Sequence, residues 1–333
     1  MTNPILVEVT RGDLVESVHR GAIAVADASG ALRLALGDVT APVYSRSSLK
    51  PMQAMVLVES GAAEAFGLGD EEIALACASH SGEPMHTERV AAWLARIGLR
   101  ERDLACGAHP SRYEPVAEAM IRAGEKPTRI FNNCSGKHTG FLTVARHWDV
   151  ATEGYEHAEH PVQRAVAAVL RDLSGAGEMP YGIDGCAAPN FATSLTEFAR
   201  AAAKMAAPDG LAKPRADAAR RIIGAMIAHP ELMSGTGRAC ATLIRAGGGR
   251  VSVKTGAEGF FGGWLPQGGL GIAIKIDDGA GRAAETAIAA VLDRLGLLGE
   301  RARGILRAPV LNTRGAVVGE RRPAAALDGI SIS

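Results

Sequence analysis

The chain contains 333 residues, of which 47% are hydrophobic, 22% are charged and only 4% are aromatic. Lysine and arginine together number 36, as do aspartate and glutamate, so the formal net charge is zero and neither a nucleic acid nor an anionic membrane is favoured as a partner. This composition is typical of a globular protein with a core of aliphatic side chains and alanine, and it favours a small polar substrate.

The chain shows no targeting pattern and no disulfide pattern. The N-terminal stretch "MTNPILVEVTRGDLVESVHRG" has no basic start followed by an apolar run, and no uncharged apolar stretch is long enough to span a bilayer. The five cysteines are scattered and odd in number, which favours free thiols or metal ligands over a disulfide framework. These features predict a cytoplasmic protein.

In chain order, the sequence predicts strands first and helices next. "VESVHRGAIAVAD" (15–27) predicts strands, residues 51–65 predict a helix, and "EEIALACAS" (71–79) predicts a buried strand that runs into a loop. In the segment "HPVQRAVAAVLRDLSG", Pro161 suits the first helical position and Gly175 lies just past the end. Together with this segment, helices are predicted at 85–97, 115–124, 160–175, 194–206 and 214–228.

The last third of the chain changes character. "RVSVKTG" (250–256) and "LGIAIKI" (270–276) alternate as strands do, and a helix is predicted at 280–296. No G-x-G-x-x-G opens the chain, so a Rossmann domain is not expected. We expect an α/β fold with a mixed, mainly antiparallel sheet flanked by helices. We expect one domain over 1–333, with a helical subregion around 105–235.

The stretch "SRSSLK" places Ser47 three residues before Lys50. Side chains at i and i+3 are neighbours on a helical turn, and Pro51 would clash with the Ser47 carbonyl inside a helix, so the turn belongs at a helix start. Free backbone N–H groups there can stabilise an oxyanion. The pattern predicts a serine nucleophile with a lysine base, and the alternative is a serine-rich helix cap.

Two later stretches add a second serine and a second lysine. "CASHSGE" contains Ser79, and "KTG" begins with Lys254. With S-x-x-K they follow the order of the serine β-lactamase and penicillin-binding signature, with S-H-S in place of S-D-N. Ser79 therefore pairs with Lys254 in this interpretation, and two nearby lysines would lower each other's pKa. The alternatives are a polar strand end and an exposed strand lysine.

Two cysteine-containing stretches suggest thiol or metal chemistry. "NNCSGKHTGF" (132–141) is not a Walker A loop, because Phe131 stands where the first glycine belongs and His138 follows the lysine. It contains Cys134, and "IDGCAAPN" contains Cys186. Two thiolates and a third ligand could hold zinc with one open position, and the alternative is a pair of reactive or buried thiols.

Six stretches in order resemble the rhizobial-type L-asparaginase II family over about residues 5–300: "EVTRGDLVESVHRG", "SRSSLKPMQA", "ACASHSGEPMH", "NNCSGKHTGF", "YGIDGCAAPNFA" and "VKTGAEGF". The resemblance implies a fold like that of serine β-lactamases and glutaminases. It also implies hydrolysis of L-asparagine to aspartate and ammonia, in a homodimer.

The resemblance also assigns site residues. It implies Ser47 as nucleophile with Lys50, and Ser79 with Lys254 as a second tandem. It implies a zinc site beside the pocket, which supports substrate binding and is dispensable, with Asp184 near it and Cys240 matching another family cysteine. The implied zinc ligands are Cys134, Lys137 and Cys186.

Candidates for substrate contacts are chosen by their charge and by their closeness in sequence to the predicted catalytic residues. The α-carboxylate of asparagine needs a cation, for which Arg46 is a candidate, although a solvated surface arginine is the alternative. Its α-ammonium needs an anion, for which Asp184 or Glu258 is a candidate. Further candidates for hydrogen bonds are His80, His138 and Thr139. The rival functions are a penicillin-recognising or esterase-like serine acylase and a non-catalytic zinc or thiol protein.

Overall fold

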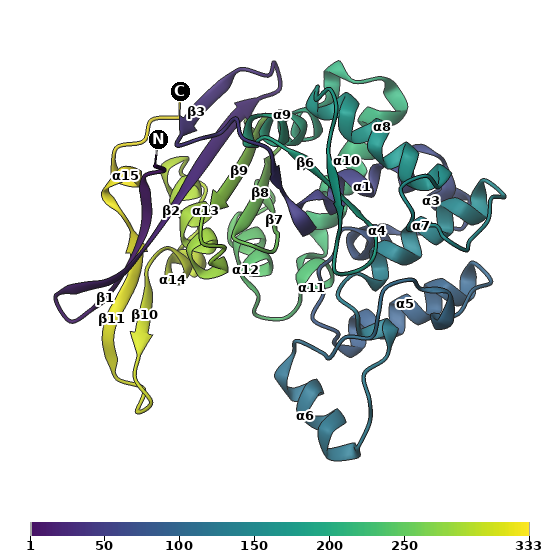
Figure 1. Ribbon diagram of the computed structural model, residues 1–333, viewed down its shortest axis with the longest axis horizontal. Helices are drawn as coiled ribbons and strands as arrows, with labels where there is room; N and C mark the ends of the chain where they lie inside the picture. Colours follow the sequence, from purple (N-terminus) through teal and green to yellow (C-terminus); the bar gives the residue numbers. More distant parts are fainter. Residues whose placement is uncertain (1, 333) are drawn as a thin grey trace.

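A large sheet and a group of helices lie side by side in the computed structural model, which describes residues 2–332 (Figure 1). Residues 1 and 333, the ends of the predicted domain, lie outside the described residues. The sheet follows the order β10-β11-β1-β2-β9-β8-β7, with β3 paired to β2, and the pairings between its described strands are antiparallel. The predicted α/β fold class, with an antiparallel sheet flanked by helices, is confirmed.

The strands fall into two sheets. The large sheet contains β1 (Ile5–Arg11), β2 (Leu14–Asp27), β3 (Leu32–Leu36), β7 (Ser252–Thr255), β8 (Phe260–Leu265), β9 (Leu270–Ile276), β10 (Ala308–Leu311) and β11 (Val317–Pro323). The small sheet contains β4 (Val43–Tyr44), β5 (Tyr181–Ile183) and β6 (Pro189–Thr193).

Along the chain, most helices follow the first strands of the large sheet and precede its last strands. The α-helices are α1 (Lys50–Gln53), α2 (Met55–Glu59), α3 (Ala62–Ala65), α4 (Asp70–Ala76), α5 (Pro84–Arg96), α6 (Glu114–Ala123), α7 (Ser135–His147), α8 (Pro161–Ser174), α9 (Leu195–Ala206), α10 (Lys213–Ala228), α11 (Pro230–Ser234), α12 (Ala239–Ala246), α13 (Gly281–Arg294), α14 (Arg303–Leu306) and α15 (Ala325–Asp328). The short 3-10 helices are η1 (Arg46–Leu49), η2 (Glu101–Asp103), η3 (Arg129–Phe131), η4 (Pro208–Gly210) and η5 (Glu300–Ala302). Within the described chain, none of these helices is long and apolar enough to cross a membrane.

The strand predicted at 71–79 is wrong, because Asp70–Ala76 forms helix α4. The Glu72 carboxylate accepts a hydrogen bond from the Gly69 backbone N–H at 2.9 Å and caps the helix start. The apolar residues that follow are buried because α4 packs between α10 and α7. A short apolar run has no periodicity that separates a buried strand from a buried helix, which explains the error.

The other predicted elements are found with small differences. The predicted helix at 51–65 is broken into α1, α2 and α3, with Gly61 in a left-handed conformation (φ 81°) before α3. Helix α8 begins at Pro161 and ends before Gly175, which is also left-handed, as predicted. Strand β8 was not predicted, and it lies between β7 and β9 in the sheet.

Helix α9 packs directly on the sheet at Gly271 of β9. A Cβ atom at this position would lie 2.1 Å from the Ala199 carbonyl oxygen and 2.3 Å from the Ala203 nitrogen. Both contacts are backbone atoms in the middle of a helix, which a side-chain rotation cannot relieve. The contact therefore fixes how closely α9 approaches the sheet.

We expect Gly271→Ala to lower the free energy of unfolding by about 3 kcal/mol, because a methyl group must push α9 away from β9. Urea denaturation monitored by circular dichroism measures the change. The control is Gly281→Ala at the start of α13, where nothing lies within 4 Å of an added Cβ, so its stability should match the unchanged protein. Equal stability of both variants would contradict the tight packing of α9.

Candidate active site

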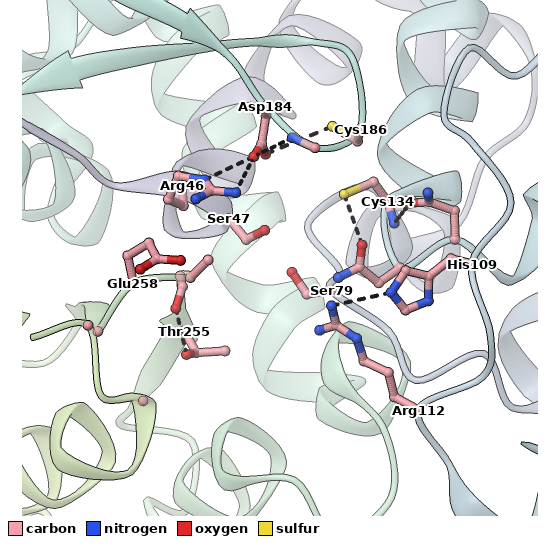
Figure 2. A pocket seen from close by; sticks show the side chains of 18 of the residues that line it. Arg46, Ser47, Ser79, His109, Arg112, Cys134, Asp184, Cys186, Thr255 and Glu258 are labelled. Atoms are coloured by element: carbon pink, nitrogen blue, oxygen red, sulfur yellow. Dashed lines mark hydrogen bonds and ion pairs between the residues drawn. The ribbon is translucent and has the colours of Figure 1, made fainter.

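A cavity of about 410 Å³ lies between the large sheet and the helices, and several predicted site residues line it (Figure 2). They come from η1, from the loop after α4, from the turn before α7, from the loop between β5 and β6, and from the segment after β7. These predicted residues are Arg46, Ser47, Ser79, Cys134, Asp184, Cys186 and Glu258. The fold thus gathers residues that are more than 200 positions apart in the chain, as Arg46 and Glu258 are.

Ser79 lies between two buried lysines. Lys254 Nζ donates to Ser79 Oγ at 2.8 Å, and Lys50 Nζ donates to the same oxygen at 3.0 Å. Both lysine side chains are fully enclosed, with 1% exposure for Lys50 and none for Lys254. Lys254 is therefore not an exposed strand residue. One hydroxyl in contact with two amines is an arrangement suited to moving a proton.

Burial and the nearby charge of Lys50 lower the pKa of Lys254 to about 7. An ordinary lysine has a pKa of about 10.4 and is charged at neutral pH. Lys254 is instead neutral in a large share of molecules at pH 7. A neutral amine can accept a proton, so Lys254 can act as a general base in this pH range.

Ser47 does not hydrogen-bond to Lys50 in this structure, although the sequence spacing predicts that contact. Lys50 begins α1, and its amine donates instead to Ser79 and to the Ala78 and Asn133 carbonyls. Ser47 lies in η1, half-buried on the cavity wall, and its Oγ has no hydrogen-bond partner among residues 2–332. Its hydroxyl is thus open to a bound molecule.

Arg46 forms an ion pair with Asp184 across the cavity wall. Its Nε and Nη2 atoms donate to Asp184 Oδ1 at 2.9 and 2.6 Å (Figure 2). Arg46 is half-buried with a left-handed backbone (φ 50°), a conformation that is uncommon for residues with side chains. The two residues that were predicted to hold opposite ends of the substrate therefore neutralise each other.

The two pocket thiols lie close to Lys137. Lys137 Nζ donates to Cys186 Sγ at 3.0 Å, and both cysteines are 4% exposed. A hydrogen bond from Cys134, together with the Lys137 charge, holds the pKa of Cys186 well below its usual range despite burial. The same hydrogen bond and burial raise the pKa of Cys134. These opposite shifts favour the thiolate form at Cys186 and the thiol form at Cys134.

The donor set at these thiols fits zinc only if the lysine takes part. Within the described chain, no three His, Cys, Asp or Glu side chains are grouped so as to hold a metal ion. Cys134, Cys186 and the Lys137 amine supply two sulfurs and one nitrogen, which are donors that zinc accepts. Burial disfavours the charged form of Lys137, but the neighbouring Cys186 and Cys134 sulfurs outweigh it and raise the pKa of the amine, so a metal would have to displace a proton from it.

Three residues predicted to bind substrate do not line the cavity. His80 is fully buried, is stacked on His86, and lies 2.9 Å from Ser135 Oγ through its Nε2. His138 lies 2.6 Å from the Tyr155 hydroxyl, and Thr139 donates to the Ser135 carbonyl. Their polar contacts are made within the protein, around the start of α7.

Several cavity residues have no sequence signal of their own. They include two arginines, one histidine and one glutamate that belong to none of the motifs. These residues are His109, Arg112, Arg238 and Glu285. Asn132 and Asn133 also line the cavity, and they precede Cys134 in the stretch "NNCSGKHTGF" that was considered for thiol or metal chemistry.

A family model described as L-asparaginase II matches residues 7–323. No curated protein matches the chain. The chain is similar to the solved structure of Mglu in its native form, with 15% identity and a TM-score of 0.46. The matched region covers 84% of this chain and 65% of the Mglu chain. It is also similar to a putative β-lactamase from Bacteroides dorei (14% identity, TM-score 0.43, 77% of this chain and 84% of that chain). A β-lactamase from Mycobacterium bovis is similar too (15% identity, TM-score 0.41, 86% and 93%).

Proposed function

Because the chain belongs to the L-asparaginase II family, a family of amidohydrolases, we propose that it hydrolyses the side-chain amide of L-asparagine to L-aspartate and ammonia. The observation that carries this proposal is the group formed by Ser79, Lys50 and Lys254 beside the open hydroxyl of Ser47. A nucleophile and a base in one cavity are what acyl transfer through an ester requires.

Ser47 is the proposed nucleophile. Its Oγ faces the cavity without a hydrogen-bond partner among the described residues, whereas the Ser79 oxygen is engaged by both lysines. Ser47 Oγ attacks the amide carbon of asparagine, and its proton passes to Lys50, which is neutral once its own proton has moved through Ser79 to Lys254. Backbone N–H groups at the start of η1 hold the oxyanion. Lys50 does not touch Ser47 without substrate, and catalytic hydrogen bonds are often long until substrate binds.

Ser79 relays protons in this mechanism. The proton taken from Ser47 reaches the leaving nitrogen through Ser79, which Lys50 and Lys254 hold, and ammonia departs. A water molecule then attacks the β-aspartyl ester. Its proton goes to Lys50, which is neutral again after the transfer to nitrogen, and Lys50 returns it to Ser47 Oγ as aspartate leaves. The proton held by Lys254 then moves back through Ser79 to Lys50. Each serine and lysine ends the cycle in its starting state.

Ammonia release from L-asparagine tests the proposal directly, with nitrocefin as the comparison substrate. We expect asparagine turnover and no comparable nitrocefin turnover. Nitrocefin hydrolysis at a similar rate would favour the penicillin-recognising or esterase-like acylase instead. Absence of both activities would favour a non-catalytic zinc or thiol protein.

We also propose that Cys134, Lys137 and Cys186 hold a zinc ion that supports substrate binding and is not essential to bond cleavage. When bound, zinc supplies a Lewis acid beside the cavity. The three side chains supply the donor atoms. Because Cys134 and Cys186 both line the cavity, a metal ion held by them would face a bound substrate. The cycle described above uses none of them.

We expect Cys134→Ala and Cys186→Ala each to lose most of the bound zinc, because each removes one of two sulfur donors. Inductively coupled plasma mass spectrometry of the purified protein measures metal content. Cys77→Ala, at a buried thiol outside the cavity, is the matched control and should keep its zinc. Full occupancy in all three variants would remove these ligands from the proposal.

The resemblance to the rhizobial-type family supports three further proposals. The chain acts as one domain over 1–333, with a helical subregion around 105–235. It assembles as a homodimer, and it works in the cytoplasm. Light scattering coupled to size-exclusion chromatography tests the assembly, where a monomer at assay concentration would contradict it.

A further inference from the structure

The charges of the cavity show where a substrate anion can bind. Arg46, the cation next to the proposed nucleophile, is already paired with Asp184. Arg112 and Arg238 also line the cavity, and within residues 2–332 neither has a carboxylate within 4.0 Å. Among the residues that the structure describes, the guanidinium of Arg112 makes one hydrogen bond, a long one of 3.5 Å to His109 Nε2. These two arginines are therefore the cavity cations that remain available.

Both arginines face the cavity without neutralisation. Figure 2 shows the Arg112 guanidinium directed toward Ser79, while the Arg46–Asp184 pair lies on the other side of the two serines. Arg112 is exposed at the cavity, and the desolvation of its guanidinium by the cavity wall lowers its pKa, as does the charge of Arg238. Burial raises the pKa of the Glu285 carboxyl although the charges of Arg321 and Arg238 oppose this, and no ion pair joins Glu285 to Arg238. A bound anion would relieve the repulsion between the two arginines.

Both arginines are anchored to the loop that carries Ser79. The Arg112 backbone N–H and the Ser111 hydroxyl each donate to the Ser81 carbonyl at 2.8 Å. On the other side, the buried Glu83 carboxylate accepts hydrogen bonds from the Thr236 N–H at 2.9 Å and from its hydroxyl at 2.6 Å. These two hydrogen bonds fix the turn that runs from Thr236 to Arg238. The two cations are thus held at set positions relative to the catalytic group.

We propose that Arg112 and Arg238, rather than Arg46, bind the α-carboxylate of the substrate and make the site specific for free amino acids with a side-chain amide. This inference rests on the proposed function and deepens it. An amide that lacks the carboxylate leaves two cations unpaired in the cavity, so it binds weakly. Arg46 instead positions the Asp184 loop.

The test compares L-asparagine with 3-aminopropanamide, which is asparagine without its α-carboxylate. The unchanged protein should prefer asparagine. Arg112→Gln and Arg238→Gln should each lower kcat/KM for asparagine by about ten- to a hundred-fold, mainly through KM, because each removes a hydrogen bond to a charged group. Neither variant should lower the rate with 3-aminopropanamide, and the lysine variants at both positions should recover part of the loss.

A second measurement does not require turnover. Isothermal titration of L-aspartate and β-alanine, its analogue without the α-carboxylate, compares binding in the same variants. L-Aspartate should bind about ten- to a hundred-fold more weakly to each glutamine variant, and β-alanine should be unaffected. The control is Arg122→Gln on α6, an exposed arginine paired with Glu118, which should change neither measurement.

The outcomes separate the two proposals. If the unchanged protein releases no ammonia from asparagine, the proposed function fails. If it does, and both glutamine variants keep their KM, the carboxylate site is elsewhere and the inference fails alone. Equal losses with asparagine and 3-aminopropanamide would also overturn it, because the arginines would then act on the fold or on the chemistry.

Discussion

Replacing Ser47 with alanine is expected to lower kcat for asparagine by at least about a thousand-fold. The variant removes the only atom proposed to bond to the substrate carbon, and no other residue forms the ester. Ser79 is assigned to proton transfer instead, because its oxygen accepts hydrogen bonds from both Lys254 and Lys50. Ammonia release under saturating asparagine measures the loss.

Ser45→Ala is the matched control for this variant within the same "SRSSLK" stretch. The Ser45 hydroxyl is buried and has no hydrogen-bond partner in the part of the chain that the structure describes, so its removal should leave kcat close to that of the unchanged protein. Mass spectrometry of peptides from acid-quenched enzyme locates the aspartyl adduct. An adduct on the peptide that contains Ser79, with kcat preserved in Ser47→Ala, would exchange the roles of the two serines.

Replacing Lys254 with methionine is expected to lower kcat by roughly a hundred- to ten-thousand-fold, the range for loss of a general acid–base group. Methionine has a similar length and fills the same buried space beside Ser79 without an amine. A buried methionine also avoids the cost of enclosing a charge, so thermal unfolding should show no loss of stability. The control is Lys204→Met on α9, outside the cavity, which should retain full activity.

The pH profile distinguishes a base from a residue that only supports the fold. Lys254 has a pKa lowered to about 7, so it carries a proton below this pH and is neutral above it. A base must be neutral before it accepts a proton, so kcat/KM of the unchanged protein should rise as pH increases through about 7. Lys254→Met should lose that rise. A profile of the same shape in both proteins would assign the rise to another group.

Local signals predicted the parts of the fold that depend on neighbours in sequence. Helix α8 was predicted with both its ends, because proline at the first position and glycine after the last act within a few residues. Helix α4 was predicted as a strand, because its short apolar run has no period and only its packing against α7 and α10 makes it a buried helix.

In the candidate site, too, the motifs predicted some contacts, whereas others depend on the folded structure. Motif order linked Ser79 to Lys254, although 175 residues separate them. It did not show that Lys50 turns to Ser79 as well, since spacing alone favoured Ser47. Arg112 and Arg238 belong to no motif, and hydrogen bonds to Ser81 and Glu83 help to hold their loops at the cavity. Isolated cations on unrelated loops have no spacing that a sequence can reveal.

The Arg46–Asp184 ion pair joins two segments with different chemistry. Arg46 precedes the proposed nucleophile, and Asp184 stands two residues before Cys186, so the pair couples the serine turn to the thiol loop. We therefore expect oxidation of Cys186, or an ion bound there, to affect the position of Ser47 through this ion pair. Linkage makes this reciprocal for binding: a substrate held against Ser47 must change the affinity of the thiol pair for its own ligand by the same factor.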